Sequence, residues 1–136
     1  MTVRGKTVTL RSTLRRQLID ITAEVIKFVS DNDVTDGILT VSVPHATAAV
    51  IVNENERGLL SDIQMKIEEL FPQRSTYAHN EIDHNADAHL AAAFLGHSRT
   101  FPIERHQLIR GTWQNIFLVE LDGPRARRNV NLTILS

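Results

Sequence analysis

The stretch "TWQNIFLVELDGPRARRNVNLTIL", residues 112–135, contains two predicted strands near the end of the chain. It contains two apolar segments, and the second, residues 129–135, alternates apolar with polar side chains in the period of a half-buried strand. The sequence "DGP" at residues 122–124 is a turn signal between them. The end of the chain is therefore predicted to be rich in strands, and the short connections along the chain favour mostly antiparallel pairing.

Further strands and three helices are predicted upstream of this stretch. The expected strands cover residues 6–12, 36–43, 47–52, 99–103 and 107–111. One amphipathic helix starts at Asp20 as N-cap and reaches Asn32, and a second covers residues 59–70 and ends before Pro72. The third covers residues 86–95, between Asn85 as N-cap and Gly96, and residues 72–84 are expected to be irregular. This order predicts one α+β domain over residues 1–136 with mostly antiparallel pairing.

The composition is that of an ordinary globular domain and excludes several classes. The 136 residues are 42% hydrophobic and 23% charged, with a net charge of −1, so neither nucleic acid nor an anionic membrane is an expected partner. The N-terminus lacks the pattern of a signal peptide, which predicts a cytoplasmic protein. Because there is no cysteine, a metal site would have to use nitrogen and oxygen ligands.

Three of the six histidines fall in "YAHNEIDHNADAHLAAAFLG", residues 77–96. His84 and His89 are five residues apart, which is about 140° around a helix and excludes the i, i+4 zinc motif. His84 also precedes the predicted helix. An extended segment from Tyr77 would bring His79 to His89 across the loop–helix junction. His89 belongs to the stripe that we expect to face inward, together with Ala86, Leu90, Ala93 and Phe94.

Two interpretations of these histidines are open. Neutral imidazole is a common metal ligand, and His45 in "VPHATAA" is the candidate that would complete an open site with His79 and His89. Alternatively, the inward histidines are structural and bond to the backbone. The spacing by itself favours the second interpretation.

Other polar residues also have a structural and a functional interpretation. Asp87 falls in the first turn of the third helix, where the helix dipole favours an acid, and a role as general base or metal partner is the alternative. Trp113 is expected to anchor the core. Arg125 follows the "DGP" turn and has the geometry to hold phosphate, whereas Arg127 and Arg128 are expected to be solvated.

The chain resembles the YjbQ-like family. The motifs "PHATAA", Asn53–Glu54, "YAHN", "NADAHLAAAFLG", "FPI" and "GTWQNIFLVELDGPR" occur in this order between about Thr7 and Ile134. The resemblance implies a compact α+β fold with a β-sandwich-like core and assembly as a homotrimer. It also implies a weak thiamine-phosphate synthase activity, in which a pyrimidine pyrophosphate joins a thiazole phosphate and pyrophosphate is released.

The resemblance also implies a set of site residues. The family's polar motif positions match His45, Tyr77, His79, Asn85, Asp87, His89, Trp113, Gln114 and Arg125. His45, His79 and His89 would bind a divalent metal ion, zinc or magnesium, or act directly on a phosphorylated small molecule. Asp87 would orient a histidine or carry a proton. The substrate would contact Asn85, Trp113, Gln114 and Arg125. His97, His106 and Arg110 depart from the family's pattern, and the two histidines are expected at the surface.

Two further functions are compatible with the same residues. A metal-dependent hydrolase would use metal-bound water on a small phosphorylated or amide substrate. A trimer that binds a metal ion or a small ligand without catalysis would use the histidines structurally. Turnover of a panel of phosphate esters separates the two enzyme hypotheses, and metal binding without turnover favours the third.

Overall fold

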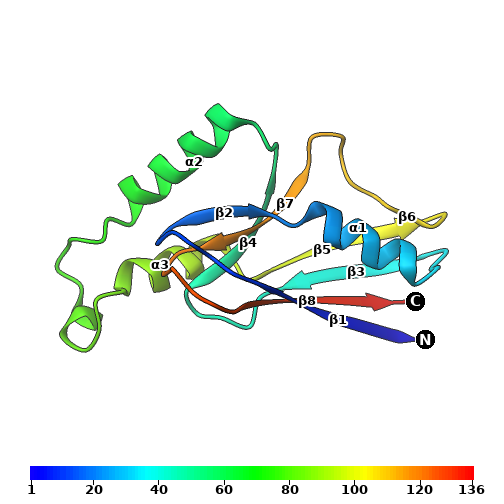
Figure 1. The fold of residues 1–136 in the computed structure, drawn as a ribbon, viewed down its shortest axis with the longest axis horizontal. Coiled ribbons are helices and arrows are strands. Elements are labelled where there is room, and N and C mark those ends of the chain that lie inside the picture. Colours follow the sequence, from blue (N-terminus) through cyan, green and yellow to red (C-terminus); the bar gives the residue numbers. More distant parts are fainter.

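The computed structural model describes residues 1–136, and its strands form two antiparallel sheets (Figure 1). The five-stranded sheet has the order β1-β8-β3-β5-β6 and the three-stranded sheet the order β2-β7-β4. The strands are β1 (Val3–Leu10), β2 (Gln17–Asp20), β3 (Gly37–Ser42), β4 (Ala48–Asn53), β5 (Ser98–Glu104), β6 (Gln107–Leu108), β7 (Asn115–Glu120) and β8 (Arg128–Leu135). The helices are α1 (Thr22–Asp31), α2 (Arg57–Leu70), the 3-10 helix η1 (Ala78–Glu81) and α3 (Ala86–Leu95).

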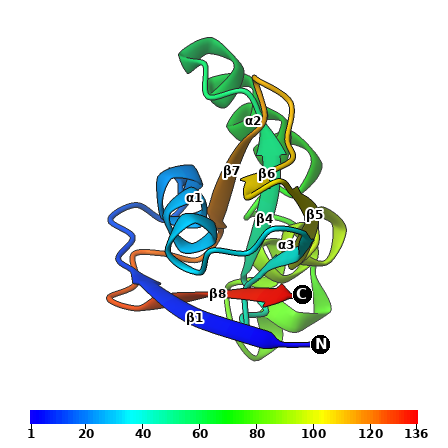
Figure 2. The same ribbon diagram turned by 90° about the vertical axis from the view of Figure 1, so that its right-hand side faces the viewer.

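The two sheets enclose the main core, which confirms the predicted α+β class and sandwich-like arrangement. Leu39, Phe101 and Leu132 of the large sheet share one buried cluster with Val50 and Leu118 of the small one, and α1 closes it with its own apolar face. Figure 2 shows α1 lying beside β7 and above β8. A second cluster lies on the other face of the small sheet, beneath α2 and α3. Because β7 is buried on both faces, its sequence is a continuous apolar run rather than an alternating one.

The inward face of α3 differs from the prediction. Ala88, Ala91 and Ala92 pack against the small sheet, whereas Phe94 is 77% exposed and its ring lies 5.4 Å from that of Phe71. The helix is apolar around most of its circumference, so periodicity could not choose the buried side. The size of the side chains determines which side is buried, because alanine permits a close approach of the helix to β4. Gly96 ends the helix with φ of +96°, as expected.

The segment before α1 was also predicted incorrectly. Residues 17–20 form β2, which pairs with β7, and α1 begins at Thr22 rather than at Asp20. The Asp20 carboxylate nevertheless accepts hydrogen bonds from the Thr22 backbone N–H (2.9 Å) and hydroxyl (2.6 Å). Asp20 therefore holds the first turn of the helix from the strand, one residue before the N-cap position.

The strands around residues 107–115 are shorter than predicted. Only residues 107–108 pair as β6, and residues 112–114 form a turn before β7. Trp113 in this turn is 70% exposed, which contradicts the expected core anchor. The Gln114 side-chain oxygen accepts the Gly111 N–H at 2.7 Å, so a local hydrogen bond closes the turn and leaves the indole outside the fold.

Helix α2 projects from the body of the domain, as Figure 1 shows at its upper left. Ile67 is its one buried residue, and Leu70 at the end of the helix is 62% exposed. Glu56 caps its start by accepting the N–H groups of Gly58 and Leu59. None of the helices has the length and apolar character that crossing a membrane requires.

Candidate functional site

Two of the predicted histidines meet beside a hollow. His79 lies on η1, so the segment is helical rather than extended as predicted, yet its ring centroid is 4.8 Å from that of His89 on α3 in a T-shaped arrangement. The Tyr77 hydroxyl donates to the Pro72 carbonyl (2.8 Å) and holds the loop in front of η1. The hollow measures about 470 Å³ and is lined by Thr76, Tyr77, Ala78, His79, Ala86, His89 and Leu90.

His45 lies at a neighbouring hollow. Its Nε2 accepts the Asn129 backbone N–H at 2.9 Å, so the neutral ring carries its hydrogen on Nδ1. Burial, reinforced by the nearby Arg128 cation, lowers the pKa of His45 below its usual value. A hollow of about 320 Å³ is lined by His45, His89 and His97 among alanines. His89 thus borders both hollows, and His97 and His84 are exposed.

The predicted metal ligands do not form a three-ligand centre within the chain. His79 and His89 lie side by side, but the Nε2 of His45 is occupied by a backbone N–H. No group of three histidine, aspartate or glutamate side chains is arranged to hold a metal ion. An open catalytic zinc site needs three protein ligands. Within one chain, therefore, the residues present do not fit such a site.

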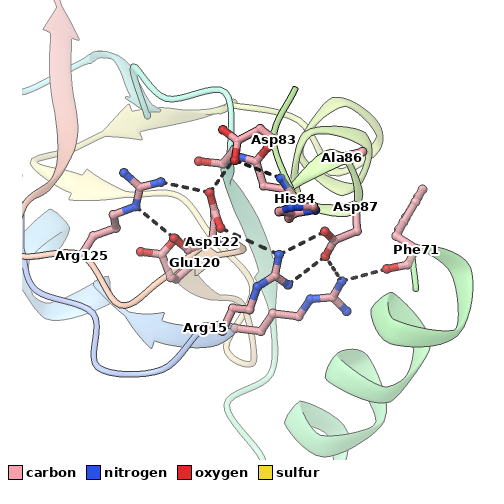
Figure 3. Close-up of polar contacts among 12 residues, drawn as sticks. Arg15, Phe71, Asp83, His84, Ala86, Asp87, Glu120, Asp122 and Arg125 are labelled. Carbon is pink, nitrogen blue, oxygen red and sulfur yellow. Dashed lines mark hydrogen bonds and ion pairs between the residues drawn. The ribbon is translucent and has the colours of Figure 1, made fainter. Parts of the chain in front are cut away.

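Asp122 connects three of the polar residues near the histidines. Its Oδ2 accepts hydrogen bonds from Asn85 Nδ2 (2.9 Å) and Arg125 Nη2 (3.0 Å), and its Oδ1 lies 3.8 Å from Arg15 Nη2. Asn85 Oδ1 in turn is 3.2 Å from His79 Nε2. Figure 3 shows the Asp122 carboxylate between the side chains of Arg125 and Arg15. Asn85 occupies the N-cap position of α3 as predicted, but its side chain joins this cluster instead of capping the helix.

Asp87 belongs to a buried ion-pair cluster. Its side chain is 1% exposed and accepts paired hydrogen bonds from Arg15 (2.9 and 3.0 Å) and one from Arg16 (2.6 Å) (Figure 3). Burial alone would raise the pKa of Asp87, but the hydrogen bonds and charges of the two arginines outweigh it and lower the pKa. The hydrogen bonds that this carboxylate accepts from side chains come from the two arginines and not from a histidine. Its hydrogen bonds connect α3 to the segment before β2 and, through Arg16, to Phe71 at the end of α2.

Arg128 was expected in solvent but is buried. Its side chain is 4% exposed, its Nε donates to both carboxylate oxygens of Glu120 (2.9 and 3.1 Å), and Nη2 donates to the Thr47 hydroxyl (2.9 Å). Glu120 is fully buried, and Arg128 and Ser12 keep its pKa low although burial opposes this. Arg127 is exposed, as predicted. The Arg128–Glu120 pair fixes the start of β8. The next residue, Asn129, donates the backbone hydrogen bond to His45.

Trp113 and Gln114 lie at the other end of β7 from Asp122. The six residues of β7 separate them, and a strand of that length spans roughly 20 Å. Gln114 closes its own turn and Trp113 is exposed. Within one chain, therefore, these two residues do not share the histidine hollow. Sequence reasoning missed Arg15, Arg16, Asp122 and Glu120.

The lowered carboxylate pKa values predict acid sensitivity. Asp20, Asp87 and Glu120 all have a pKa below the ordinary value in the folded chain. Their contribution to stability is fully present above the unfolded pKa of about 4 and is lost as the pH falls through the folded values. We expect the free energy of unfolding, measured by urea titration, to stay nearly constant between about pH 7 and 5 and to decrease below about pH 4. Equal stability at pH 3 and 6 would contradict the observed ion pairs.

Known proteins resemble this chain over nearly its whole length. The family model described as "UPF0047 protein YjbQ-like" matches residues 6–136. A UPF0047 protein of Methanothermobacter thermautotrophicus is 46% identical over 128 residues, 94% of this chain and 90% of that protein. The UPF0047 protein YugU of Bacillus subtilis is 34% identical, over 90% of this chain and 92% of that protein. The crystal structure of a YbjQ-like protein of unknown function from Sulfolobus solfataricus superposes with a TM-score of 0.98 at 45% identity, covering 99% of this chain and 98% of the other.

Proposed function

Because the chain belongs to the YjbQ-like family, we propose that it is a small transferase with weak thiamine-phosphate synthase activity at the hollow beside His79 and His89. One observation carries the proposal: two imidazoles 4.8 Å apart border a 470 Å³ hollow, and one of them contacts a polar cluster that includes an arginine. A hollow of this size accommodates a small molecule.

The proposed reaction needs one proton donor. The C–O bond between the pyrimidine methylene carbon and pyrophosphate breaks, and its electron pair leaves with the pyrophosphate oxygen. The thiazole nitrogen uses its lone pair to form the new C–N bond and becomes positively charged. A protonated histidine can donate its proton to the departing pyrophosphate, a contribution of general acids that is typically about 10²–10⁴-fold in rate. His79 is assigned this role because its ring lies at the hollow and is held by Asn85.

Arg125 is the residue assigned to the substrate phosphate. Two of its nitrogens are held, Nε by the Asp122 carbonyl (2.9 Å) and Nη2 by the Asp122 carboxylate (3.0 Å), which leaves Nη1 without a partner in the chain. The side chain is 48% exposed, so Nη1 is accessible. A guanidinium fixed in this way loses little freedom when it binds phosphate.

The assay that tests the proposal combines both substrates with native, untagged protein. We expect thiamine phosphate and pyrophosphate to appear in equal amounts. Arg125→Ala should raise the KM for the thiazole phosphate by roughly tenfold or more, the value of a charge-assisted hydrogen bond. The neighbouring exposed variant Arg127→Ala should leave KM unchanged. No product above the enzyme-free rate would contradict the proposal, as would an equal effect of both variants.

Further assays on the same protein distinguish two alternatives. A metal-dependent hydrolase would release phosphate from a panel of phosphate esters, would lose this activity with a chelator, and would contain about one metal ion per chain by elemental analysis. A binding module would convert neither set of substrates. The proposed transferase requires turnover of the paired substrates and its loss on replacement of His79.

The homotrimer that the resemblance implies is part of the proposal. Large apolar side chains are exposed on and beside the hollow-bearing helix, including Leu90 and Phe94 on α3 and Leu70 on α2. Large apolar side chains that are exposed in a single chain are often covered where proteins contact one another. Light scattering should give a mass near three times the 15.3 kDa of one chain, and the mass of a single chain would contradict it.

A further inference from the structure

We propose that Asp122 is a positioning residue, which acts through Asn85 to hold the neutral His79 ring with its hydrogen on Nε2 and its Nδ1 free for proton exchange. The inference deepens the proposed function by naming the reactive atom of His79. Its structural part, the tautomer of His79, does not depend on any turnover.

The orientation of the Asn85 amide follows from its contact with Asp122. An ionised carboxylate only accepts hydrogen bonds. The Asn85 atom that lies 2.9 Å from Asp122 Oδ2 must therefore be the NH₂ group. Asp122 itself is held in place, because the same oxygen accepts Arg125 Nη2 at 3.0 Å and its side chain is 18% exposed.

The orientation of Asn85 in turn determines which nitrogen of His79 carries the hydrogen. With its NH₂ group directed at Asp122, Asn85 presents its oxygen to His79 Nε2 at 3.2 Å. An amide oxygen only accepts, so Nε2 must carry a hydrogen. Nδ1 then holds the lone pair of the neutral ring and has no hydrogen-bond partner in the chain. Protonated, Nδ1 is the atom that donates to the leaving pyrophosphate.

The same carboxylate also fixes Arg125. Asp122 accepts a hydrogen bond from Arg125, the proposed phosphate-binding residue, at 3.0 Å, and one from Asn85, which contacts His79, at 2.9 Å. It thereby orients Arg125 and His79 together. Replacing a residue that orients a metal-ligating side chain typically costs roughly 10–100-fold in affinity or activity, and we expect the same order for a carboxylate that orients a proton donor. We expect Asp122→Leu to lower kcat by that amount, and Asp122→Asn, which retains one oxygen acceptor for Asn85, to lose much less.

The tautomer is measured directly by nuclear magnetic resonance. In protein labelled with ¹⁵N at histidine, correlations between ring nitrogens and ring hydrogens separate a protonated from an unprotonated nitrogen. Spectra at about pH 8.5 observe neutral rings, since free histidine titrates near 6.5, and His79→Gln identifies the His79 signals. In native protein the His79 ring should show the Nε2–H form alone.

The variants test the path through Asn85. Asp122→Leu and Asn85→Ala should both admit the Nδ1–H form, seen as the two nitrogen shifts moving toward each other, whereas Asp122→Asn and the exposed control Asp83→Asn should keep the native pattern. A native Nδ1–H form, or an unchanged pattern in both Asp122→Leu and Asn85→Ala, would overturn the inference. If Asp122→Leu does not fold, Asn85→Ala still decides. The predicted tautomer without any synthase activity would refute the proposed function and leave the structural part of this inference, the tautomer of His79, standing.

Discussion

Arg128→Ala is expected to lower the free energy of unfolding by about 3–5 kcal/mol. The reason is the partner that it would leave behind. Glu120 is fully buried, and both of its carboxylate oxygens accept hydrogen bonds from the Arg128 Nε. A buried carboxylate without its counter-ion keeps the cost of desolvation and loses the attraction that offsets it. The Thr47 hydroxyl and carbonyl would lose their bonds to Nη2 as well.

The neighbouring arginine provides the control for this prediction. Arg127→Ala removes an exposed side chain from the same loop and should change stability by less than about 0.5 kcal/mol. The double variant Glu120→Leu with Arg128→Met removes both charges and should recover most of the loss, since well-packed apolar residues often replace a buried pair without cost. Urea unfolding measures all three proteins. Similar losses for Arg127→Ala and Arg128→Ala would contradict the buried pair.

His79→Ala is expected to reduce thiamine phosphate formation by about 10²–10⁴-fold, the usual contribution of a general acid. The imidazole lies at the hollow and contacts His89 on one side and Asn85 on the other. Because His79 is exposed on a short 3-10 helix, its loss should leave stability nearly unchanged. The fall should therefore appear in kcat and not in the melting temperature.

His84 is the matched control for His79. It lies five residues further along the chain, is also exposed, and does not line the His79–His89 hollow. His84→Ala should keep the native rate within a factor of about two. A comparable loss of activity in His79→Ala and His84→Ala would assign the effect to the loop as a whole and not to a proton donor.

The antiparallel architecture was predictable because it depends on local patterns. Alternation along β8 holds in the structure. The connection after β7 does not join antiparallel neighbours, because β7 lies in the small sheet and β8 in the large one. β2 was missed because "RRQLID" is too short and too polar to show a period. The buried face of α3 was missed because its alanines and its phenylalanine are all apolar, and only the size of the space beneath the helix distinguishes them.

The site was predictable in part. The contact between His79 and His89 was predictable because the helix start at Asn85 was correctly located. The partners of Asp87 were not predictable, because they come from a segment some seventy residues away and leave no local signal. The burial of Arg128 did have one. Position 128 shares the inward parity of Val130, Leu132 and Ile134 in β8, so extending the alternation by one step assigns this arginine to the core.

Restoring the missing imidazole is the sharpest test of His79 as the proton donor. In His79→Gly the removed ring leaves space beside the 470 Å³ hollow, which free imidazole can enter from solvent. The measurement is the rate of thiamine phosphate formation by this variant as imidazole is added. We expect the rate of His79→Gly to rise with the imidazole concentration and then to saturate, and the rate of His84→Gly to show no such rise. A folded His79→Gly protein whose rate stays at the uncatalysed level at every imidazole concentration would contradict it.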